Sequence, residues 1–217
     1  MVIAIDGPSG AGKGTVARLV AARLGYRHVD TGAMYRALAW LALHEGVAFE
    51  QEEAVARLGE EAVFELGDVV RVAGHDVTAA IRTPAIDAAS ASVARLPKVR
   101  EALVARQRSL GVRGGVVMEG RDIGTVVFPD ADVKVFLDAD PLERARRRAR
   151  DHGPAENLDA VASALAARDT IDRTRPTSPL VRASDAVFID TTGLGIEAVV
   201  ARILALVDDA RATRASS

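Results

Sequence analysis

The chain has 217 residues, which is the size of one α/β domain, or of a core domain with a small insert. Hydrophobic residues make up 49%, and this excludes an intrinsically disordered chain. With 28 Lys and Arg against 30 Asp and Glu, the formal net charge of -2 argues against a polymeric nucleic-acid binder, which needs a basic excess. There is no cysteine, so disulfides, thiolate metal sites and a cysteine nucleophile are excluded.

The N-terminal residues lack the basic and long apolar segments of a signal peptide, and no apolar run approaches about 18 residues. We therefore expect a cytoplasmic protein without a membrane partner. Nothing in the sequence indicates an oligomer, so a monomer is the default expectation.

Apolar runs and helical apolar spacing alternate along the chain. Residues 2–5 form a predicted strand, followed by a glycine-rich loop and a helix that reaches about Leu24. The remaining predicted elements of this pattern are a strand ending at Val29-Asp30, a helix over about 33–45, strands at 115–118, 133–137 and 186–189, a closing helix over about 196–208 and a frayed tail at 211–217. Because the strands lack polar alternation, we expect an α/β fold of three layers, with a parallel sheet covered by helices on both faces.

Residues 60–82 break this alternation of strands and helices. Apolar residues there alternate roughly with polar ones and are punctuated by Gly67-Asp68 and Gly74-His75. The pattern predicts a small antiparallel hairpin or meander inserted into the α/β core. Two helices are predicted after it, over about 86–95 and 99–110.

The strongest motif lies between the first strand and the first helix. It satisfies G-x-x-x-x-G-K, with glycine at the usual Ser/Thr position and Thr15 one step later. Backbone N–H groups of such a loop cradle phosphates, Lys13 would bridge the β- and γ-phosphates, and Thr15 would serve Mg²⁺ directly or through water. The alternative is a strand-to-helix turn that binds nothing. The ATP-binding residues are predicted to be Gly7, Pro8, Ser9, Gly10, Ala11, Gly12, Lys13, Gly14 and Thr15.

GTPases, motor ATPases and small-molecule kinases all use such a loop, and the extra glycine resembles that of nucleoside monophosphate kinases. A phosphoryl-acceptor site is therefore sought after other strands, since ligands of α/β proteins bind at the carboxyl ends of strands. The segment Asp30-Thr31-Gly32-Ala33-Met34-Tyr35-Arg36 follows the second strand. Its plainer interpretation is a helix start with Thr31 as N-cap.

A second cluster, 118–125, follows the strand at 115–118. Glu119 stands where an acidic residue holds Mg²⁺ through water, whereas Arg121 and Asp122 could instead form a surface ion pair. In a third cluster, Arg168, Asp172 and Arg175 are spaced i, i+4 and i+7 on one helix face, which could also be a salt-bridge ladder.

Between these two clusters, an arginine-rich helix over 144–148 runs into Asp151-His152-Gly153-Pro154. It suits a mobile lid that carries Arg147, or a charged solvent face, and we favour the solvent face for Arg146.

These motifs, in this order, resemble those of bacterial cytidylate kinases, a family of nucleoside monophosphate kinases among the P-loop proteins. The resemblance extends over nearly the whole chain and is especially close at 120–131, at Pro179-Leu180-Val181 and at Ser184-Asp185-Ala186. It implies a single domain over 1–217. The implied parts are a core of about 1–32, 112–150 and 170–210, an acceptor-binding insert of about 33–110 and a lid of about 150–168.

The resemblance also implies a role for each site residue. Catalysis would involve Lys13, Arg121, Arg175 and Arg147, and Mg²⁺ would be held by Thr15 and Glu119. The CMP-binding residues would be Asp30, Thr31, Tyr35, Arg36, Arg100, Arg121, Asp122, Arg168, Asp172 and Arg175. Among these, Arg36, Arg121 and Arg175 would hold the phosphate, Arg100 and Asp122 the cytosine, and Arg168 and Asp172 the sugar. The family's base-contacting serine falls at Ala91, between Ser90 and Ser92.

The implied reaction is transfer of the γ-phosphoryl group of ATP to CMP or dCMP, in pyrimidine nucleotide metabolism. The rival hypotheses are a kinase for another acceptor, such as UMP or a hydroxyl group, and a nucleotide-dependent switch or binding module. A switch would not need phosphate-binding arginines in three separate segments.

Overall fold

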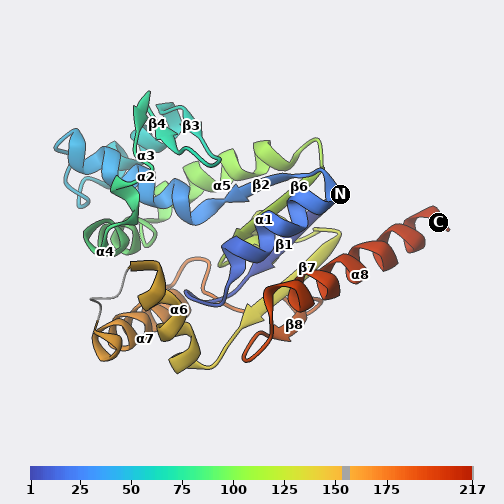
Figure 1. Ribbon diagram of the computed structural model, residues 1–217. Helices are drawn as coiled ribbons and strands as arrows, with labels where there is room; N and C mark the ends of the chain where they lie inside the picture. The colour runs from blue at the N-terminus through green and yellow to red at the C-terminus, as the bar shows by residue number, and fades with distance from the viewer. Residues whose placement is uncertain (153–156, 217) are drawn as a thin grey trace. The chain divides into compact units, whose positions relative to one another are not determined.

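A computed structural model describes residues 1–152 and 157–216 (Figure 1). Within it the chain forms two compact units. The first comprises Met1–His28 and Gly114–Ser217, and the second comprises Val29–Arg113.

The first unit is built on a five-stranded sheet in the order β2-β6-β1-β7-β8. The strands are β1 (Val2–Asp6), β2 (Arg27–Asp30), β6 (Val116–Gly120), β7 (Val133–Asp138) and β8 (Val187–Asp190). β1 pairs in parallel with both β6 and β7, and β7 pairs in parallel with β8. The predicted parallel sheet is thus confirmed. Because β1, β6 and β7 are parallel neighbours, the loops that follow these three strands leave the sheet at the same edge.

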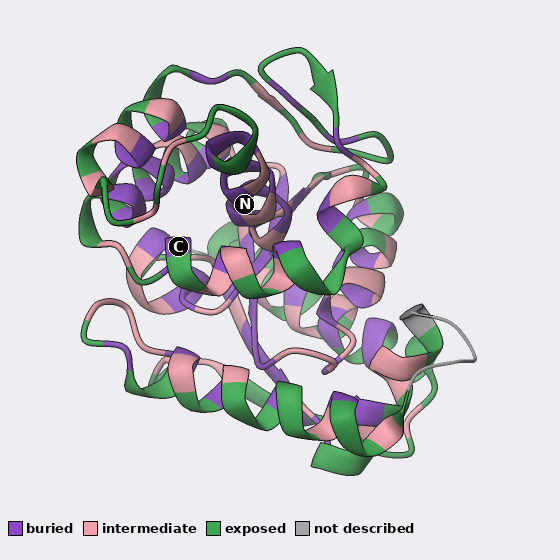
Figure 2. Ribbon diagram, turned by 90° about the vertical axis from the view of Figure 1, so that its left-hand side faces the viewer, coloured by how far each residue is buried: buried purple, intermediate pink, exposed green. Residues whose placement is uncertain are grey.

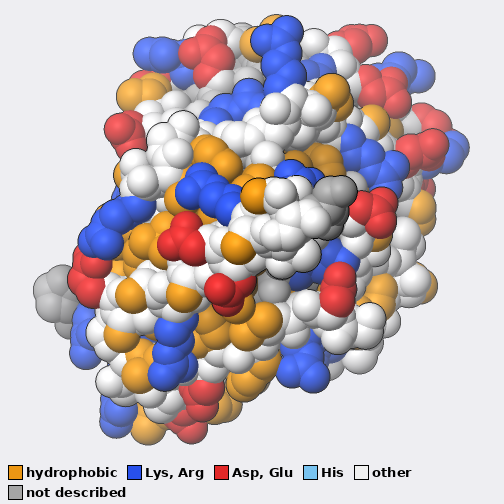
Figure 3. All heavy atoms as spheres, turned by 90° about the vertical axis from the view of Figure 1, so that its right-hand side faces the viewer, with side chains coloured by type: hydrophobic (Ala, Val, Ile, Leu, Met, Phe, Trp, Pro, Cys, Tyr) orange, Lys and Arg blue, Asp and Glu red, His pale blue; other side chains and the backbone are white. Residues whose placement is uncertain are grey.

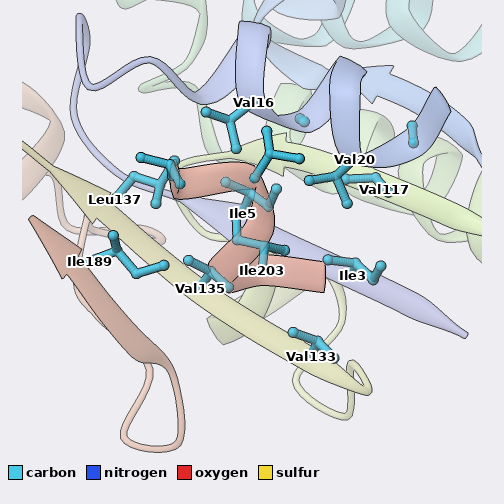
Figure 4. Packing of buried hydrophobic residues seen from close by; sticks show 14 of the residues in the cluster. Ile3, Ile5, Val16, Val20, Val117, Val133, Val135, Leu137, Ile189 and Ile203 are labelled. Atoms are coloured by element: carbon cyan, nitrogen blue, oxygen red, sulfur yellow. The ribbon is translucent and has the colours of Figure 1, made fainter. Parts of the chain in front are cut away.

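Alternate residues of the strands build the hydrophobic core of this unit. Ile3 and Ile5 of β1 pack with Val135 of β7 against two helices, α1 (Lys13–Leu24) and α8 (Ile196–Ala215) (Figure 4). Val16 of α1 and Ile203 of α8 point into the same cluster. The apolar face of the strands, which repeats every two residues, therefore packs against the apolar faces of α1 and α8 in one buried layer.

The C-terminal helix is longer than predicted. The expected frayed tail at 211–217 is wrong for its described part, because α8 continues to Ala215. Arg211 in this last stretch donates to the Tyr26 hydroxyl at 3.3 Å, and the Thr213 hydroxyl donates to Asp209 O at 3.0 Å. The apolar spacing of the sequence does not indicate this last stretch of helix, which is polar and makes these side-chain contacts.

The remainder of the first unit carries three elements after β6. They are the π-helical turn η2 (Ile123–Val127) and the helices α6 (Pro141–His152) and α7 (Leu158–Thr174). α6 and α7 pack through Ala145, Val161 and Leu165. The loop residues Gly153 and Pro154 of the predicted lid lie outside the described residues.

The second unit contains four α-helices and a small sheet in its described elements. The helices are α2 (Thr31–His44), α3 (Glu52–Glu61), α4 (Pro84–Val93) and α5 (Pro97–Gly111), with a 3₁₀ turn η1 (Ala80–Arg82). β3 (Phe64–Glu65), β4 (Arg71–Val72) and β5 (His75–Asp76) form an antiparallel meander. The inserted meander predicted within 60–82 and the two helices after it are confirmed.

The start of α2 differs from the alternative interpretation of this segment, in which Thr31 is the N-cap. Asp30 is the N-cap, because its Oδ1 accepts a hydrogen bond from Ala33 N at 2.9 Å. Thr31 is the first helical residue and is buried. Asp and Thr are both good capping residues, so the sequence alone did not distinguish them.

Several helices expose one side to solvent and bury the other (Figure 2). Charges of both signs are distributed over the surface, as the formal net charge of -2 leads us to expect. Figure 3 shows basic and acidic side chains interspersed with apolar ones over one face. Within the described ranges, no helix has the length and apolarity to cross a membrane.

Candidate active site

The phosphate loop leads from β1 directly into α1. Lys13, the first residue of α1, is only 6% exposed, and its ammonium donates to Pro8 O at 2.7 Å. The side chain is thereby folded back over the loop. The first N–H groups of α1 and the positive end of its dipole face the same loop, which makes this the expected place for nucleotide phosphates.

Glu119 lies at the end of β6, beside this loop. A Cβ on Gly14 would lie only 3.1 Å from Glu119 Oε1, so the glycine at the usual Ser/Thr position leaves room for the carboxylate. Glu119 is 6% exposed and its Oε1 is 3.0 Å from His28 Nε2. Thr15 directly follows Gly14 in the chain. A carboxylate and a hydroxyl are oxygen donors that suit Mg²⁺, which completes its shell with water and substrate phosphates.

A charged cluster joins the loop after β6 to the end of α7. Arg121 Nε donates to Asp172 Oδ2 at 2.9 Å, and Arg168 Nε lies 4.0 Å from the same oxygen. Arg175 Nη2 lies 3.7 Å from Asp122 Oδ1, and its Nη1 lies 3.8 Å from Asp172 Oδ1. Three arginines thus surround two carboxylates.

The structure therefore resolves two alternatives from the sequence. Arg121 and Asp122 do not form the suggested pair: Arg121 bonds to Asp172 and Asp122 faces Arg175. The i, i+4 pair on α7 exists, but Asp172 is buried and its carboxylate also contacts Arg121. A solvated ladder would not involve a residue from the loop after β6.

The electrostatics of this cluster favour its charged state. Burial raises the pKa of Asp172, but the charges of Arg121, Arg168 and Arg175 outweigh it and hold the pKa below its usual value. Burial likewise lowers the pKa of Arg121, while Asp172, Asp169 and Glu119 more than compensate and raise it. The carboxylates thus keep the guanidinium groups charged and oriented, and converging guanidinium groups are well suited to bind an anion such as a phosphate.

Asp6, at the end of β1, holds the loop that carries Arg121 and Asp122. Its carboxylate accepts from Ile123 N at 2.8 Å and from Gly124 N at 2.7 Å. Burial raises the pKa of Asp6 to about 6, helped by the negative charge of Asp122 and opposed by the two backbone hydrogen bonds and Lys13. Because this pKa is raised in the folded state, the group favours folding less as the pH rises from about 4 to about 6.

The second unit brings together the other predicted CMP-binding residues in two groups. Arg36 Nη2 donates to Asp30 Oδ2 at 3.0 Å, one turn into α2. Arg100 on α5 is buried, donates to Ala94 O at 3.3 Å and places its guanidinium 5.5 Å from the centre of the Tyr35 ring. Asp30 with Arg36, and Tyr35 with Arg100, are therefore neighbours.

Arg147 of α6 is held by several contacts. Its Nε donates to Glu143 Oε1 at 2.9 Å, and its Nη1 and Nη2 donate to Thr191 Oγ1 and O at 2.9 and 2.8 Å. Nη1 would lie 3.8 Å from a Cβ on Gly12, so the guanidinium is close to the phosphate loop. A role in catalysis remains a prediction.

Sequence reasoning gave no role to three residues that shape the site. Asp6 could have been noticed as the last residue of a buried strand, directly before the phosphate loop. Asp169 directly follows Arg168 in the third cluster, but the spacing of that cluster indicates a role only for Arg168, Asp172 and Arg175. Arg144 shares its helix with four other arginines, and only its buried contacts, described below, set it apart.

A phosphate loop with a buried lysine, a carboxylate at the end of the neighbouring strand and a cluster of arginines around two buried carboxylates together define a P-loop kinase. The fold agrees with this class. A gluconokinase from Sinorhizobium meliloti 1021 superposes with a TM-score of 0.53 at 16% sequence identity, covering 100% of this chain and 97% of that one. At this identity, the likeness shows the fold alone.

Sequence comparison is more specific. A model of the cytidylate kinase family matches residues 3–209. Proteins named cytidylate kinase from Geobacillus sp. (strain WCH70) and Geobacillus thermodenitrificans (strain NG80-2) are 49% and 51% identical over 215 residues. Each alignment covers 95% of this chain and 96% of the relative. The chain belongs to the cytidylate kinase family.

Proposed function

We propose that the chain transfers the γ-phosphoryl group of ATP to the phosphate of CMP or dCMP, with Mg²⁺ bound to the nucleotide. Family membership supports a cytidylate acceptor. The observation that carries the proposal is the cluster in which the guanidinium groups of Arg121, Arg168 and Arg175 surround the buried carboxylates of Asp122 and Asp172. Several guanidinium groups that converge in this way suit the phosphate of a nucleoside monophosphate.

The reaction needs no general base. An oxygen of the CMP phosphate, already anionic at neutral pH, forms a bond to the γ-phosphorus of ATP, and the bridging oxygen leaves with its electron pair on ADP. The difficulty is to bring two polyanions together in line. Lys13 and the backbone of the phosphate loop would hold the ATP phosphates, while Arg121 and Arg175 would hold the acceptor phosphate. Bound Mg²⁺, held by Thr15 and Glu119, would neutralise charge on the nucleotide phosphates.

The remaining residues would orient the acceptor and complete the site. Arg168 and Asp172 would bind the sugar hydroxyls. From the second unit, Arg36 would join the phosphate contacts, with Asp30, Thr31 and Tyr35 supporting it, and Arg147 would add positive charge near the ATP phosphates.

Base choice would depend on Asp122 and Arg100. A carboxylate that accepts a hydrogen bond from the amino group of cytosine would face a carbonyl in uracil and repel it. Arg100 would donate to O2 and N3 of cytosine. The proposal therefore favours CMP and dCMP over UMP and AMP.

An acceptor panel tests this function. ADP release from MgATP is measured in parallel with CMP, dCMP, UMP, AMP and shikimate. We expect fast release with CMP and dCMP and little with the others. Equal rates with UMP would retain a kinase but contradict the base-choice account. Fast release with shikimate alone would indicate a hydroxyl acceptor, and release without any acceptor an ATPase or switch.

A further inference from the structure

Arg144, near the start of α6, contacts three separate parts of the first unit. Its Nε donates to Ala139 O at 3.1 Å, just beyond β7. Its Nη1 donates to Ser9 O in the phosphate loop at 3.2 Å and to Asp169 Oδ2 on α7 at 2.6 Å. One guanidinium therefore bonds to the donor-nucleotide loop and to the helix that carries the proposed acceptor-binding residues.

The phosphate loop also packs on the backbone of Arg144. A Cβ on Gly10 would lie 2.8 Å from Arg144 O and 3.0 Å from Arg144 Cβ. Gly10 has φ +78, which also favours glycine. The loop thus contacts this one residue of α6 by hydrogen bonding at Ser9 and by close packing at Gly10, so its shape depends on the position of Arg144.

Asp169 extends the connection toward the arginine cluster. It follows Arg168 directly on α7 and precedes Asp172 by one turn. Its negative charge is one of the causes that raise the pKa of Arg121, so it lies close enough to act on that guanidinium. Arg144 is therefore hydrogen-bonded to Ser9 and to Asp169, and Asp169 interacts electrostatically with Arg121, which bonds to Asp172.

The pair is buried, which makes a purely stabilising role a weak explanation. Arg144 is 7% and Asp169 8% exposed. The desolvation of two such charges can cancel their attraction, and an apolar pair of the same volume is often equally stable. A guanidinium, however, fixes the direction of several hydrogen bonds at once, which a lysine or an apolar side chain cannot do.

We propose that Arg144 and Asp169 are positioning residues that couple the phosphate loop to the arginine cluster of α7, so that donor and acceptor nucleotides each favour the binding of the other. This inference rests on the proposed function, because it takes the cluster as the acceptor site. Neither residue contacts a reacting atom in this scheme. Coupling of this kind is reciprocal, so it can be measured from either nucleotide.

The test is calorimetric titration of a non-hydrolysable ATP analogue with Mg²⁺, in the absence and presence of saturating CMP. For the unmodified chain, we expect CMP to tighten binding of the analogue at least about fivefold. In Arg144→Lys and Asp169→Asn this factor should fall below about twofold. We also expect kcat to fall at least about tenfold in both variants, with a smaller change in the KM for ATP.

Arg146→Gln is the matched control. It removes an arginine from the same helix, but its side chain is 52% exposed and its ion pair with Glu143 is 4.0 Å long. It should retain the full coupling factor and kcat. Loss of stability alone would lower the folded fraction of a variant without changing the coupling factor among folded molecules, so that factor separates positioning from a merely structural role.

The outcomes are distinguishable. Absence of coupling in the unmodified chain, or coupling retained in either folded variant, Arg144→Lys or Asp169→Asn, overturns the inference even though CMP binds and is phosphorylated. Failure of the unmodified chain to bind CMP in a direct titration would instead contradict the proposed function. Because the two substitutions lie on different helices, either folded variant suffices for the comparison.

Discussion

Arg175 is the residue on which the proposed acceptor site depends most. It follows α7 directly, and its guanidinium lies between Asp122 and Asp172, while its Nε donates to Ser178 O at 2.5 Å. The side chain is therefore fixed by backbone and carboxylates before any nucleotide binds. Such preorganised charge is effective in phosphoryl transfer because it needs no rearrangement during the reaction.

We predict that Arg175→Ala lowers kcat with CMP by about 10²–10³-fold, which corresponds to about 3–4 kcal/mol of transition-state stabilisation. Steady-state kinetics of ADP formation measure this change. Arg175→Lys, which retains the charge but not the planar guanidinium, should lose less. Arg173→Ala is the control, because that side chain is 48% exposed and should leave kcat within about twofold. Unchanged turnover in Arg175→Ala would refute the assignment.

Gly14 sets the position of Glu119. A methyl group at this residue would force the carboxylate to move by a few tenths of an ångström, since the available distance is 3.1 Å. We predict that Gly14→Ala raises the Mg²⁺ concentration needed for half-maximal activity several-fold.

The measurement for Gly14→Ala is a Mg²⁺ titration of activity at fixed ATP. Gly195→Ala is a suitable comparison, because nothing lies within 4 Å of a Cβ added there. An identical Mg²⁺ dependence in both variants would show that Glu119 does not serve the metal.

Among the elements, the hairpin of β4 and β5 has a strained backbone at Ala73, a residue other than glycine with a positive φ. Val72 pairs with His75, so Ala73 and Gly74 form a two-residue turn with φ values of 49° and 81°. Such turns favour Asn-Gly, because the short polar side chain of Asn can hydrogen-bond locally in the left-handed region, whereas alanine has the steric cost of a Cβ without that compensation. Ala73 thus departs from the preferred turn sequence.

We expect Ala73→Asn to raise the free energy of unfolding by about 0.5–1 kcal/mol and Ala73→Val to lower it by about 1 kcal/mol or more. Denaturant unfolding of both variants provides the comparison, with opposite signs as the internal control. A loss of stability in Ala73→Asn would show that the turn is not limited by its φ values.

At the scale of the whole molecule, the proposed CMP contacts come from both units. CMP should therefore stabilise each unit against heat. At a hundredfold excess over its Kd, a ligand contributes about 2.7 kcal/mol. For a chain of this size, that corresponds to a rise in Tm of about 5–10 °C.

Two probes can test this effect on each unit. Trp40 in α2, the single tryptophan of the chain, reports on the second unit through its fluorescence, whereas far-ultraviolet ellipticity reports on all helices. We predict that CMP raises both midpoints and that UMP does so much less. An unchanged Trp40 midpoint with CMP would show that the second unit does not take part in binding.

Much of this protein could be predicted from the sequence because the information is local. The phosphate loop is contiguous, and its glycines and Lys13 have one common use between a strand and a helix. The apolar runs indicated the parallel sheet, and the alternation within 60–82 indicated the antiparallel insert. The family followed from several motifs in a fixed order, and both the family and the fold class are confirmed.

Only the tertiary structure decided which charged residues pair. Asp30 rather than Thr31 caps α2, and α8 runs through the tail that looked frayed. Arg121 bonds to Asp172, which is 51 residues away, rather than to the adjacent Asp122. Arg144 differs from the exposed Arg146 of the same helix because its guanidinium bonds to both the phosphate loop and Asp169. A sequence pattern reports the period of an element and the types of its residues, whereas a buried ion pair depends on which distant elements pack together, and that is determined when the chain folds.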